Sequence, residues 1–131
     1  MRLLLDTHVW LWMIGNEERL AEEHRATLVD PDSELFLSAA AIWELGIKAA
    51  AGKMKYTGSY ESQVPIHIRR SGVRPLAITV EHAVAAAALP MHHRDPFDRM
   101  MVAQAKVEGL TFMTADRRLA AYDVTVVDVG A

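Results

Sequence analysis

The stretch Met-Arg-Leu-Leu-Leu-Asp-Thr-His-Val-Trp, residues 1–10, decides how the fold is interpreted. Leu3, Leu4 and Leu5 form an apolar run of strand length, which ends abruptly at Asp6. Thr7 is a favourable residue for the start of a helix, and an apolar segment compatible with a helix follows it. In open parallel sheets, ligands bind beyond the carboxyl ends of the strands. Asp6 is therefore a candidate for a functional site, and capping of the following helix is the alternative.

Short apolar segments alternate with helical segments along the rest of the chain. We expect strands at residues 2–6, 35–37, 74–78, 110–113 and 124–127. We expect helices at residues 7–14, 17–28, 38–51, 59–70, 79–89, 95 to about 107, and 114–121. This alternation is typical of an α/β protein with a parallel sheet and right-handed crossovers. The length of 131 residues fits one domain, which we place at 1–131.

The composition narrows the class of protein. The chain has no cysteine, which excludes a disulfide framework, a thiolate metal site and a cysteine nucleophile and fits a cytoplasmic protein. We find no signal peptide and no apolar stretch long enough to span a membrane. The net charge of −3 argues against a broadly basic nucleic-acid binder. The chain has 17 acidic residues. If four of them, Asp6, Glu44, Asp98 and Asp116, bind a cation, the other 13 are balanced by 14 lysines and arginines, and the surface is near neutral.

Glu44 lies in the middle of the predicted helix 38–51. Its helical neighbours Ala40, Ala41 and Ile47 indicate that it borders buried surface. An ionised carboxylate is costly there unless it is paired or binds a cation. The alternative is an exposed ion pair with Lys48, one helical turn away, which contributes about 0.2–0.5 kcal/mol.

Asp98 and Asp116 lie near the starts of two later helices. Asp98 is third in the helix that Asp95 and Pro96 begin, and this is also the spacing of a capping box, so a structural role competes with a functional one. Asp116 follows the fourth predicted strand, in a helix start that we assign to Thr114. Its alternative role is a favourable interaction with the helix dipole.

The four acids together favour a metal site. Asp6 and Asp116 follow strands, and parallel strands bring their carboxyl ends to one edge of the sheet. Carboxylate clusters suit Mg²⁺ or Mn²⁺, which can activate water for attack on a phosphodiester. The histidines do not compose a zinc site, and His92, His93 and Arg94 are interpreted as a solvated loop that contacts phosphate.

With these residues laid out, the chain resembles the PIN-domain ribonucleases, specifically the VapC-like toxins of type II toxin–antitoxin pairs. The matching segments follow one another in the order of the family: Leu-Leu-Leu-Asp-Thr-His-Val-Trp-Leu-Trp (3–12), Ser-Ala-Ala-Ala-Ile-Trp-Glu-Leu-Gly-Ile-Lys (38–48), Gly-Lys-Met (52–54), His-His-Arg-Asp-Pro-Phe-Asp-Arg-Met-Met-Val-Ala-Gln-Ala (92–105) and Glu-Gly-Leu-Thr-Phe-Met-Thr-Ala-Asp (108–116). Each segment is weak evidence alone, but jointly they are specific and span nearly the whole chain. The resemblance implies a three-layer α/β/α fold with a central parallel sheet of about five strands.

The resemblance also implies a function and a set of site residues. It implies a Mg²⁺-dependent endoribonuclease, with Mn²⁺ as a substitute, that is held inactive by a cognate antitoxin and forms a homodimer. The metal-binding acids of the family fall on Asp6, Glu44 and Asp98, with Asp116 as a fourth, less regular member. Thr7, Asp95 and Thr114 would support these ligands, and we assign contacts with RNA phosphates to Lys48, Arg94, Arg99 and Arg117.

Two other classes of protein remain as alternatives. A PIN-like module that binds RNA or a protein without cutting would be expected to lack one of the acids, and none is missing here. A flavodoxin-like phosphotransfer domain also ends its first strand in an acid, but it needs a lysine after a late strand, and no lysine follows Lys106. The sequence leaves open the RNA target, the cleavage motif, the number of metal ions, the identity of the antitoxin and whether Asp116 binds metal directly.

Overall fold

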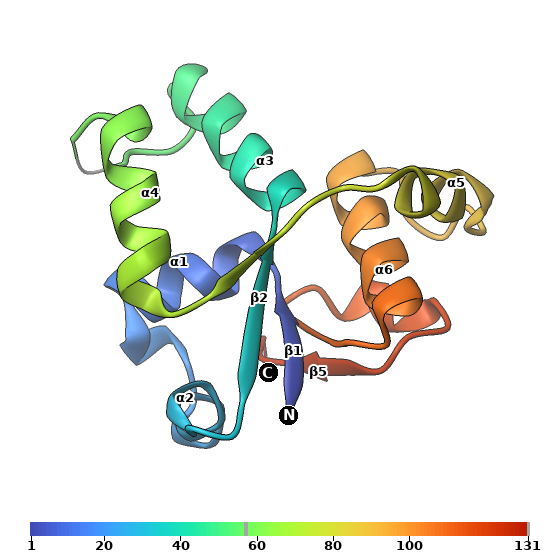
Figure 1. The fold of residues 1–131 in the computed structure, drawn as a ribbon, viewed down its shortest axis with the longest axis horizontal. Coiled ribbons are helices and arrows are strands. Elements are labelled where there is room, and N and C mark those ends of the chain that lie inside the picture. The colour runs from blue at the N-terminus through green and yellow to red at the C-terminus, as the bar shows by residue number, and fades with distance from the viewer. Residues whose placement is uncertain (57, 131) are drawn as a thin grey trace.

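The structure is a computed structural model that describes residues 1–56 and 58–130, so Thr57 and Ala131 of the predicted domain lie outside the described residues. Five strands form one parallel sheet in the order β3-β2-β1-β4-β5 (Figure 1). The strands are β1 (Arg2–Leu5), β2 (Glu34–Ser38), β3 (Arg74–Leu76), β4 (Thr111–Thr114) and β5 (Val126–Asp128). The helices are α1 (Thr7–Gly15), α2 (Glu22–Val29), α3 (Ala39–Ala50), α4 (Tyr60–Ser71), α5 (Val80–Ala88) and α6 (Pro96–Glu108), with two short 3₁₀ helices, η1 (Glu17–Arg19) and η2 (Arg117–Ala121). The predicted α/β fold with a five-stranded parallel sheet is confirmed.

Strand β1 is the centre of the sheet. It pairs with β2 on one side and β4 on the other, so that Leu4 lies opposite both Phe36 and Phe112. Leu3, Leu4 and Leu5 are fully buried, as expected for a strand that is covered on both faces. The ladder continues for one more bond, because the Asp6 backbone N–H donates to the carbonyl of Met113 at 2.9 Å. The backbone of Asp6 is thereby fixed at the carboxyl edge of the sheet.

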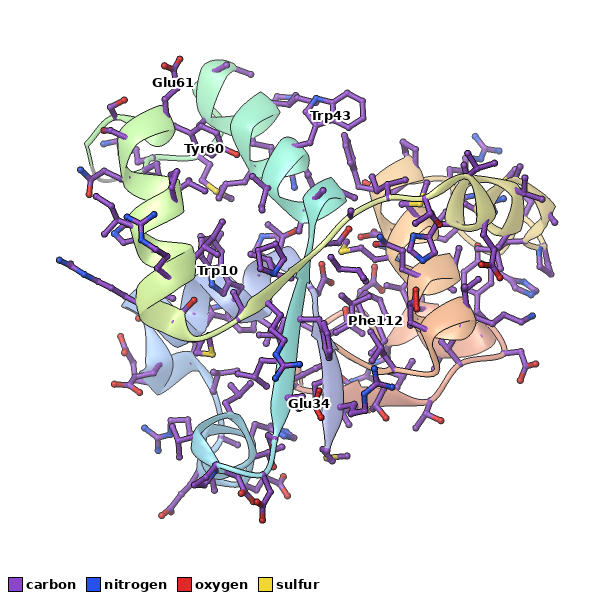
Figure 2. The ribbon with its side chains drawn as sticks, viewed as in Figure 1. Trp10, Glu34, Trp43, Tyr60, Glu61 and Phe112 are labelled. Carbon is purple, nitrogen blue, oxygen red and sulfur yellow. The ribbon has the colours of Figure 1, made fainter. Side chains whose placement is uncertain are left out.

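Helices cover both faces of this sheet. In Figure 1, α1 and α4 lie on one side of β1 and β2, α5 and α6 lie on the other, and α3 rises from the carboxyl end of β2. The indole of Trp10 on α1 is buried and donates to the Ser71 hydroxyl at the end of α4, at 3.0 Å. Figure 2 shows Trp10 on the α1–α4 side of the sheet and Phe112 on the α6 side. These two packed layers hold the carboxyl edge rigidly between them.

Three predicted boundaries are wrong, each for a local reason. The helix expected at 17–28 is divided into η1 and α2, because Leu20 and Ala21 are extended and Leu20 is buried in the core. The cap of the last short helix is Asp116 rather than Thr114. Strand β5 begins two residues later than predicted, because the Val124 N–H bonds to the carbonyl of Tyr122 in a turn.

None of the helices in the described part of the chain is long and apolar enough to cross a membrane.

Candidate metal centre

An acidic cleft of about 340 Å³ lies at the carboxyl edge of the sheet. It is lined by residues that follow β1 and β4, by residues of α1 and α3, and by residues at the start of α6: Asp6, His8, Glu44, Lys48, Asp95, Asp98, Ala115 and Asp116. The four acids that the sequence singled out all line this cleft, together with Asp95. Parallel topology thus brings together residues that are up to 110 positions apart in the chain.

Asp6 is both a helix cap and a wall of the cleft. Its Oδ1 accepts a hydrogen bond from the Thr7 backbone N–H at 2.7 Å, and its Oδ2 accepts one from the Thr114 hydroxyl at 2.6 Å. Burial raises the pKa of this carboxyl above its ordinary value, the nearby charge of Glu44 raises it further, and the two hydrogen bonds partly oppose this rise. The capping alternative and the functional interpretation of Asp6 are therefore compatible.

Glu44 is buried, although it lies on a helix with an exposed face. Its Oε1 accepts a hydrogen bond from the Thr7 hydroxyl at 2.8 Å. Its Oε2 lies 3.4 Å from Nζ of Lys48, so the predicted ion pair exists, but its acidic partner faces the cleft rather than solvent. Thr7 links the first two acids, since its N–H bonds to Asp6 and its hydroxyl bonds to Glu44.

Asp95 and Asp98 have different roles: Asp95 caps the helix, and Asp98 faces the cleft. Asp95 caps α6, because its Oδ1 accepts hydrogen bonds from the backbone N–H groups of Phe97 and Asp98 at 2.8 and 3.0 Å. The carboxylate of Asp98 faces the cleft, where its Oδ2 lies 2.8 Å from Nε2 of His93. Burial and the neighbouring charge of Asp6 raise the pKa of Asp98 to about 7, although the hydrogen bond from His93 opposes this. The negative charge of Asp98 is thus only partly compensated by His93.

Asp116 joins the cleft from the end of β4. It caps η2, with its Oδ1 accepting from the Arg118 backbone N–H at 3.0 Å. The Arg118 guanidinium also binds it bidentately, at 2.9 and 2.7 Å, and these hydrogen bonds hold its pKa below the ordinary value. Its own N–H donates to the Thr114 hydroxyl at 3.0 Å, and that hydroxyl in turn donates to Asp6.

The arrangement is suited to hold a divalent cation. Two sets of side chains place ligand atoms within 4.8 Å of one another, Glu44 with Asp95 and Asp98, and His93 with Asp98 and Asp116. Close carboxylates repel one another, and a bound cation removes that repulsion. Carboxylate oxygens are the ligands that Mg²⁺ and Mn²⁺ prefer. The donor set therefore fits the predicted metal, and the raised pKa values of Asp6 and Asp98 indicate that the cleft lacks compensating positive charge.

The four residues predicted to contact RNA lie in different environments. Lys48 lines the cleft, and Arg94 and Arg117 are exposed next to two of the acids in sequence. The prediction that Arg99 contacts RNA is wrong, because its side chain is buried beneath the loop before α6. Its guanidinium donates to the carbonyls of Pro90, Ala86 and Leu89 at 2.9–3.1 Å. These bonds make Arg99 a support of the loop.

Two residues of the cluster were not assigned to it from the sequence. His93 was placed in a solvated loop, yet its side chain is only 11 % exposed and lies between Asp98 and Asp116. The signal available in the sequence was that His93 precedes Asp98 by five residues, with the helix cap Asp95 between them. Arg118 gave no comparable signal, because its pairing with Asp116 depends on the turn that η2 makes.

Comparisons with known proteins show the family and the fold of this chain. Residues 3–124 match the family model described as PIN domain. The chain is 31 % identical over 121 residues to Ribonuclease VapC22 of Mycobacterium tuberculosis, covering 89 % of this chain and 88 % of that protein. Ribonuclease VapC16 of the same organism is 37 % identical over 60 residues, which are 46 % of this chain and 43 % of that protein. The crystal structure of VapBC2 from Rickettsia felis bound to a promoter DNA fragment has a chain of the same fold, with a TM-score of 0.73, 14 % identity and 98 % of both chains covered. A chain of VapBC-5 from Mycobacterium tuberculosis matches with a TM-score of 0.63, 22 % identity and 98 % of both chains covered.

Proposed function

Because this chain belongs to the PIN-domain family, we propose that it is a metal-dependent endoribonuclease and the toxin of a toxin–antitoxin pair. The observation that carries this proposal is the cleft in which four acids from different elements, Asp6, Glu44, Asp98 and Asp116, surround one space at the carboxyl edge of the sheet. The similarity to proteins named ribonucleases, over nearly the full length of one of them, supports the activity. It also weighs against a flavodoxin-like phosphotransfer domain.

In this proposal the four acids hold Mg²⁺, or Mn²⁺ in its place, and the threonines hold the acids. Thr7 and Thr114 fix the orientation of the Glu44 and Asp6 carboxylates through short hydrogen bonds, so little reorganisation is needed when a cation binds. A divalent cation bound there supplies an activated water and neutralises charge on a phosphodiester. Asp95 keeps the first turn of α6 in place, so the Asp98 carboxylate remains directed into the cleft.

RNA is proposed to approach the cleft along its basic rim. Lys48 lines the cleft, and Arg94 and Arg117 are exposed and adjoin Asp95 and Asp116 in the sequence. They would contact phosphates rather than bases. Phosphate contacts make binding salt-dependent, and each contact that is removed lowers the salt slope by about one. Replacing Arg117 by alanine should therefore weaken RNA binding at low salt more than at high salt, as measured by fluorescence anisotropy.

The antitoxin is proposed to bind a groove of mixed polarity on the α1–α4 side of the molecule. A groove of about 530 Å³ lies there, lined by Met13, Ile14, Leu28, Val29, His67, Arg70 and Ser71. The solved structures of similar fold include complexes named VapBC, which supports a protein partner for this chain. Such a partner would lay apolar side chains along the groove and could place a basic side chain among the acids. Co-expression with the protein encoded next to it, followed by co-purification, tests the pair.

A homodimer is proposed as the form of the free protein. Trp43 on α3 is 64 % exposed and makes an edge-on contact with Phe97 on α6. Figure 2 shows the labelled Trp43 side chain pointing outward from α3. Exposed aromatic side chains of this size are enriched in protein interfaces. Size-exclusion chromatography with light scattering decides the state, and a monomer at micromolar concentration contradicts the proposal.

RNA cleavage by the wild type, Asp6→Asn and Asp32→Asn tests the enzymatic activity. Asp6→Asn is expected to abolish cleavage in Mg²⁺, because it removes a charge and a ligand oxygen from the cleft while it retains an acceptor for the Thr7 N–H. Asp32 lies in an exposed turn, and its substitution by asparagine is the matched control that should leave cleavage unchanged. Chelation should stop cleavage by the wild type. Cleavage that survives both Asp6→Asn and chelation contradicts the assignment, and RNA binding without any cleavage favours a binding module instead.

A further inference from the structure

The imidazole of His93 lies inside the acidic cluster. Its Nε2 is 2.8 Å from Oδ2 of Asp98 and 3.8 Å from Oδ2 of Asp116. The side chain is 11 % exposed, so it is more deeply placed than either of these two acids, whose side chains are 16 % and 24 % exposed. A histidine that only neutralised one surface acid would not need to face two acids from separate elements.

The backbone of His93 is held by two buried side chains. Its N–H donates to the Tyr122 hydroxyl at 2.9 Å, and its carbonyl accepts from the same hydroxyl at 3.4 Å. Arg99 donates to that hydroxyl at 3.3 Å and to the carbonyls of the preceding residues Pro90 and Leu89. Arg99 and Tyr122 thus fix both the path of the loop and the residue that ends inside the cluster. These contacts fix the position of the His93 backbone relative to the acids.

The spacing of the three side chains fits the coordination sphere of a metal ion. Ligand bonds of about 2.1 Å at octahedral or tetrahedral angles place neighbouring ligand atoms about 3.0–3.4 Å apart. The two measured separations from His93 Nε2, 2.8 and 3.8 Å, lie on either side of this range, so small shifts of the side chains suffice. The ligand atoms of His93, Asp98 and Asp116 all lie within 4.8 Å of one another.

We propose that Nε2 of His93 is a direct ligand of the cation that Asp98 and Asp116 hold, so that this part of the cleft is a mixed nitrogen–oxygen site. The proposal rests on the proposed metal-dependent function. It extends that function by adding a ligand that the four acids do not supply. An imidazole ligand shifts the preference of a site from Mg²⁺ towards transition metals such as Mn²⁺. The expected consequence is a preference for Mn²⁺ over Mg²⁺ that depends on His93.

Electron spin-echo spectroscopy of bound Mn²⁺ tests the ligand directly. The full-length protein is prepared with ordinary histidine and with histidine carrying ¹⁵N in the ring, in the absence of RNA. The proposal expects a directly coordinated ring nitrogen in the wild type, a change of its signal on ¹⁵N labelling, and loss of the signal in His93→Gln and His93→Ala. Glutamine retains a polar group of similar length, so His93→Gln is the variant expected to preserve the fold. Thermal unfolding of both variants verifies that they are folded.

Two other histidines provide matched controls. His92 is the exposed neighbour of His93, and His8 lines the same cleft from α1. His92→Ala and His8→Ala should both retain the nitrogen signal. A signal that disappears in His8→Ala, or that persists in both His93 variants, overturns the proposal.

Titration calorimetry with Mn²⁺ and with Mg²⁺ separates this inference from the proposed function. The Mn²⁺ affinity should fall about 10–100-fold in His93→Ala, the range found when support for a metal site is removed, and the Mg²⁺ affinity should fall by less. Mn²⁺ that binds the wild type without a nitrogen ligand, or equal losses for the two metals, overturns the role of His93 and leaves the acidic metal centre standing. No binding of Mn²⁺ to the wild type overturns the proposed metal centre and the role of His93 with it.

Discussion

Two histidine–carboxylate pairs lie at opposite ends of α6. At its start, His93 faces Asp98 at 2.8 Å. At its end, His82 on α5 faces Glu108 at 3.2 Å. The pairs have the same chemistry and similar distances, but their surroundings differ. Their comparison shows how the same two residue types serve a site in one place and the fold in another.

The pair at His82 is complete by itself. The ring Nδ1 accepts from the Thr79 N–H at 3.0 Å, while Nε2 faces Glu108, so both ring nitrogens are occupied. The Thr79 hydroxyl accepts from the His82 N–H at 3.1 Å, and this reciprocal exchange caps α5. The cluster links the start of α5 to the end of α6, two helices in extensive contact. Its role is structural.

The pair at His93 is surrounded by further negative charge. Asp6, Glu44 and Asp95 all act on Asp98, and its pKa is raised to about 7. A protein gains no stability from crowding carboxylates, so the crowding indicates a site that is completed by a cation. The number of acids near the histidine, rather than the histidine–acid contact itself, distinguishes the two places.

The largest expected effect is on RNA cleavage, and it should distinguish Asp98 from Glu108. Asp98→Asn should lower RNA cleavage by at least about a thousandfold, equivalent to about 4 kcal/mol of transition-state stabilisation, because it removes a metal ligand. Glu108→Gln should leave the cleavage rate of the folded protein within about threefold of wild type, a change of less than 1 kcal/mol. Initial rates on a labelled RNA, with Mg²⁺ in excess, measure both. Equal losses in the two variants would remove the distinction.

Arg99 is expected to have the next largest effect, on stability rather than on RNA binding. Arg99→Met keeps the apolar stem but leaves the carbonyls of Ala86, Leu89 and Pro90 without their donors, which should lower the free energy of unfolding by about 3 kcal/mol. Arg94→Met is the exposed control and should change it by less than about 0.5 kcal/mol. Urea unfolding followed by circular dichroism measures both. A stable Arg99→Met protein would contradict the supporting role.

His82 should contribute less, through one cap and one buried contact. His82→Ala should lower the free energy of unfolding by about 2 kcal/mol, because α5 loses half of its capping box and Glu108 loses its partner. His93→Ala is the matching substitution in the other pair. In the metal-free protein it should lower the free energy of unfolding by less than His82→Ala does, because it removes a contact with Asp98 but no helix cap. The order of the two unfolding free energies decides whether the pairs differ as described.

The smallest effect is the contribution of Asp98 to the pH dependence of stability. Its folded pKa of about 7 exceeds its ordinary value of 3.8, so the folded state binds more protons than the unfolded state between these values. The stability of the metal-free protein should therefore fall as pH rises from 4 to 7 and stay reduced above 7. Asp98→Asn should remove this loss, worth on the order of 1 kcal/mol after solvent screening.

Chemical unfolding of the wild type and Asp98→Asn in chelator at pH 5 and pH 8 measures this difference. The variant should be stabilised relative to wild type at pH 8 more than at pH 5. Glu108→Gln, in the other pair, should show no such gain at pH 8. An Asp98→Asn advantage that does not grow with pH would show that the acid is already compensated within the protein.

The sequence predicted the strands, whereas their order in the sheet comes from the tertiary structure. The apolar run Leu3–Leu5 fits the central position of β1, because a strand that is apolar on both faces requires cover on both faces. The break between η1 and α2 could not be predicted from the sequence. It occurs because Leu20 is extended and buried in the core, and that core is formed by segments far away in the chain. Local patterns record propensities, whereas boundaries depend on what each residue packs against.

The sequence by itself determined the type of site: acids directly after apolar strands, with a threonine beside Asp6 and another before Asp116. Only the tertiary structure decided which residues enter it. Arg99 and His93 are six positions apart in one basic stretch, yet Arg99 is buried under the loop and His93 is directed among the acids. Their positions depend on Tyr122, about 30 residues later, whose hydroxyl contacts both. Charge type is local to a residue, but burial and partnership arise from contacts between distant segments, and those contacts exist only once the chain has folded.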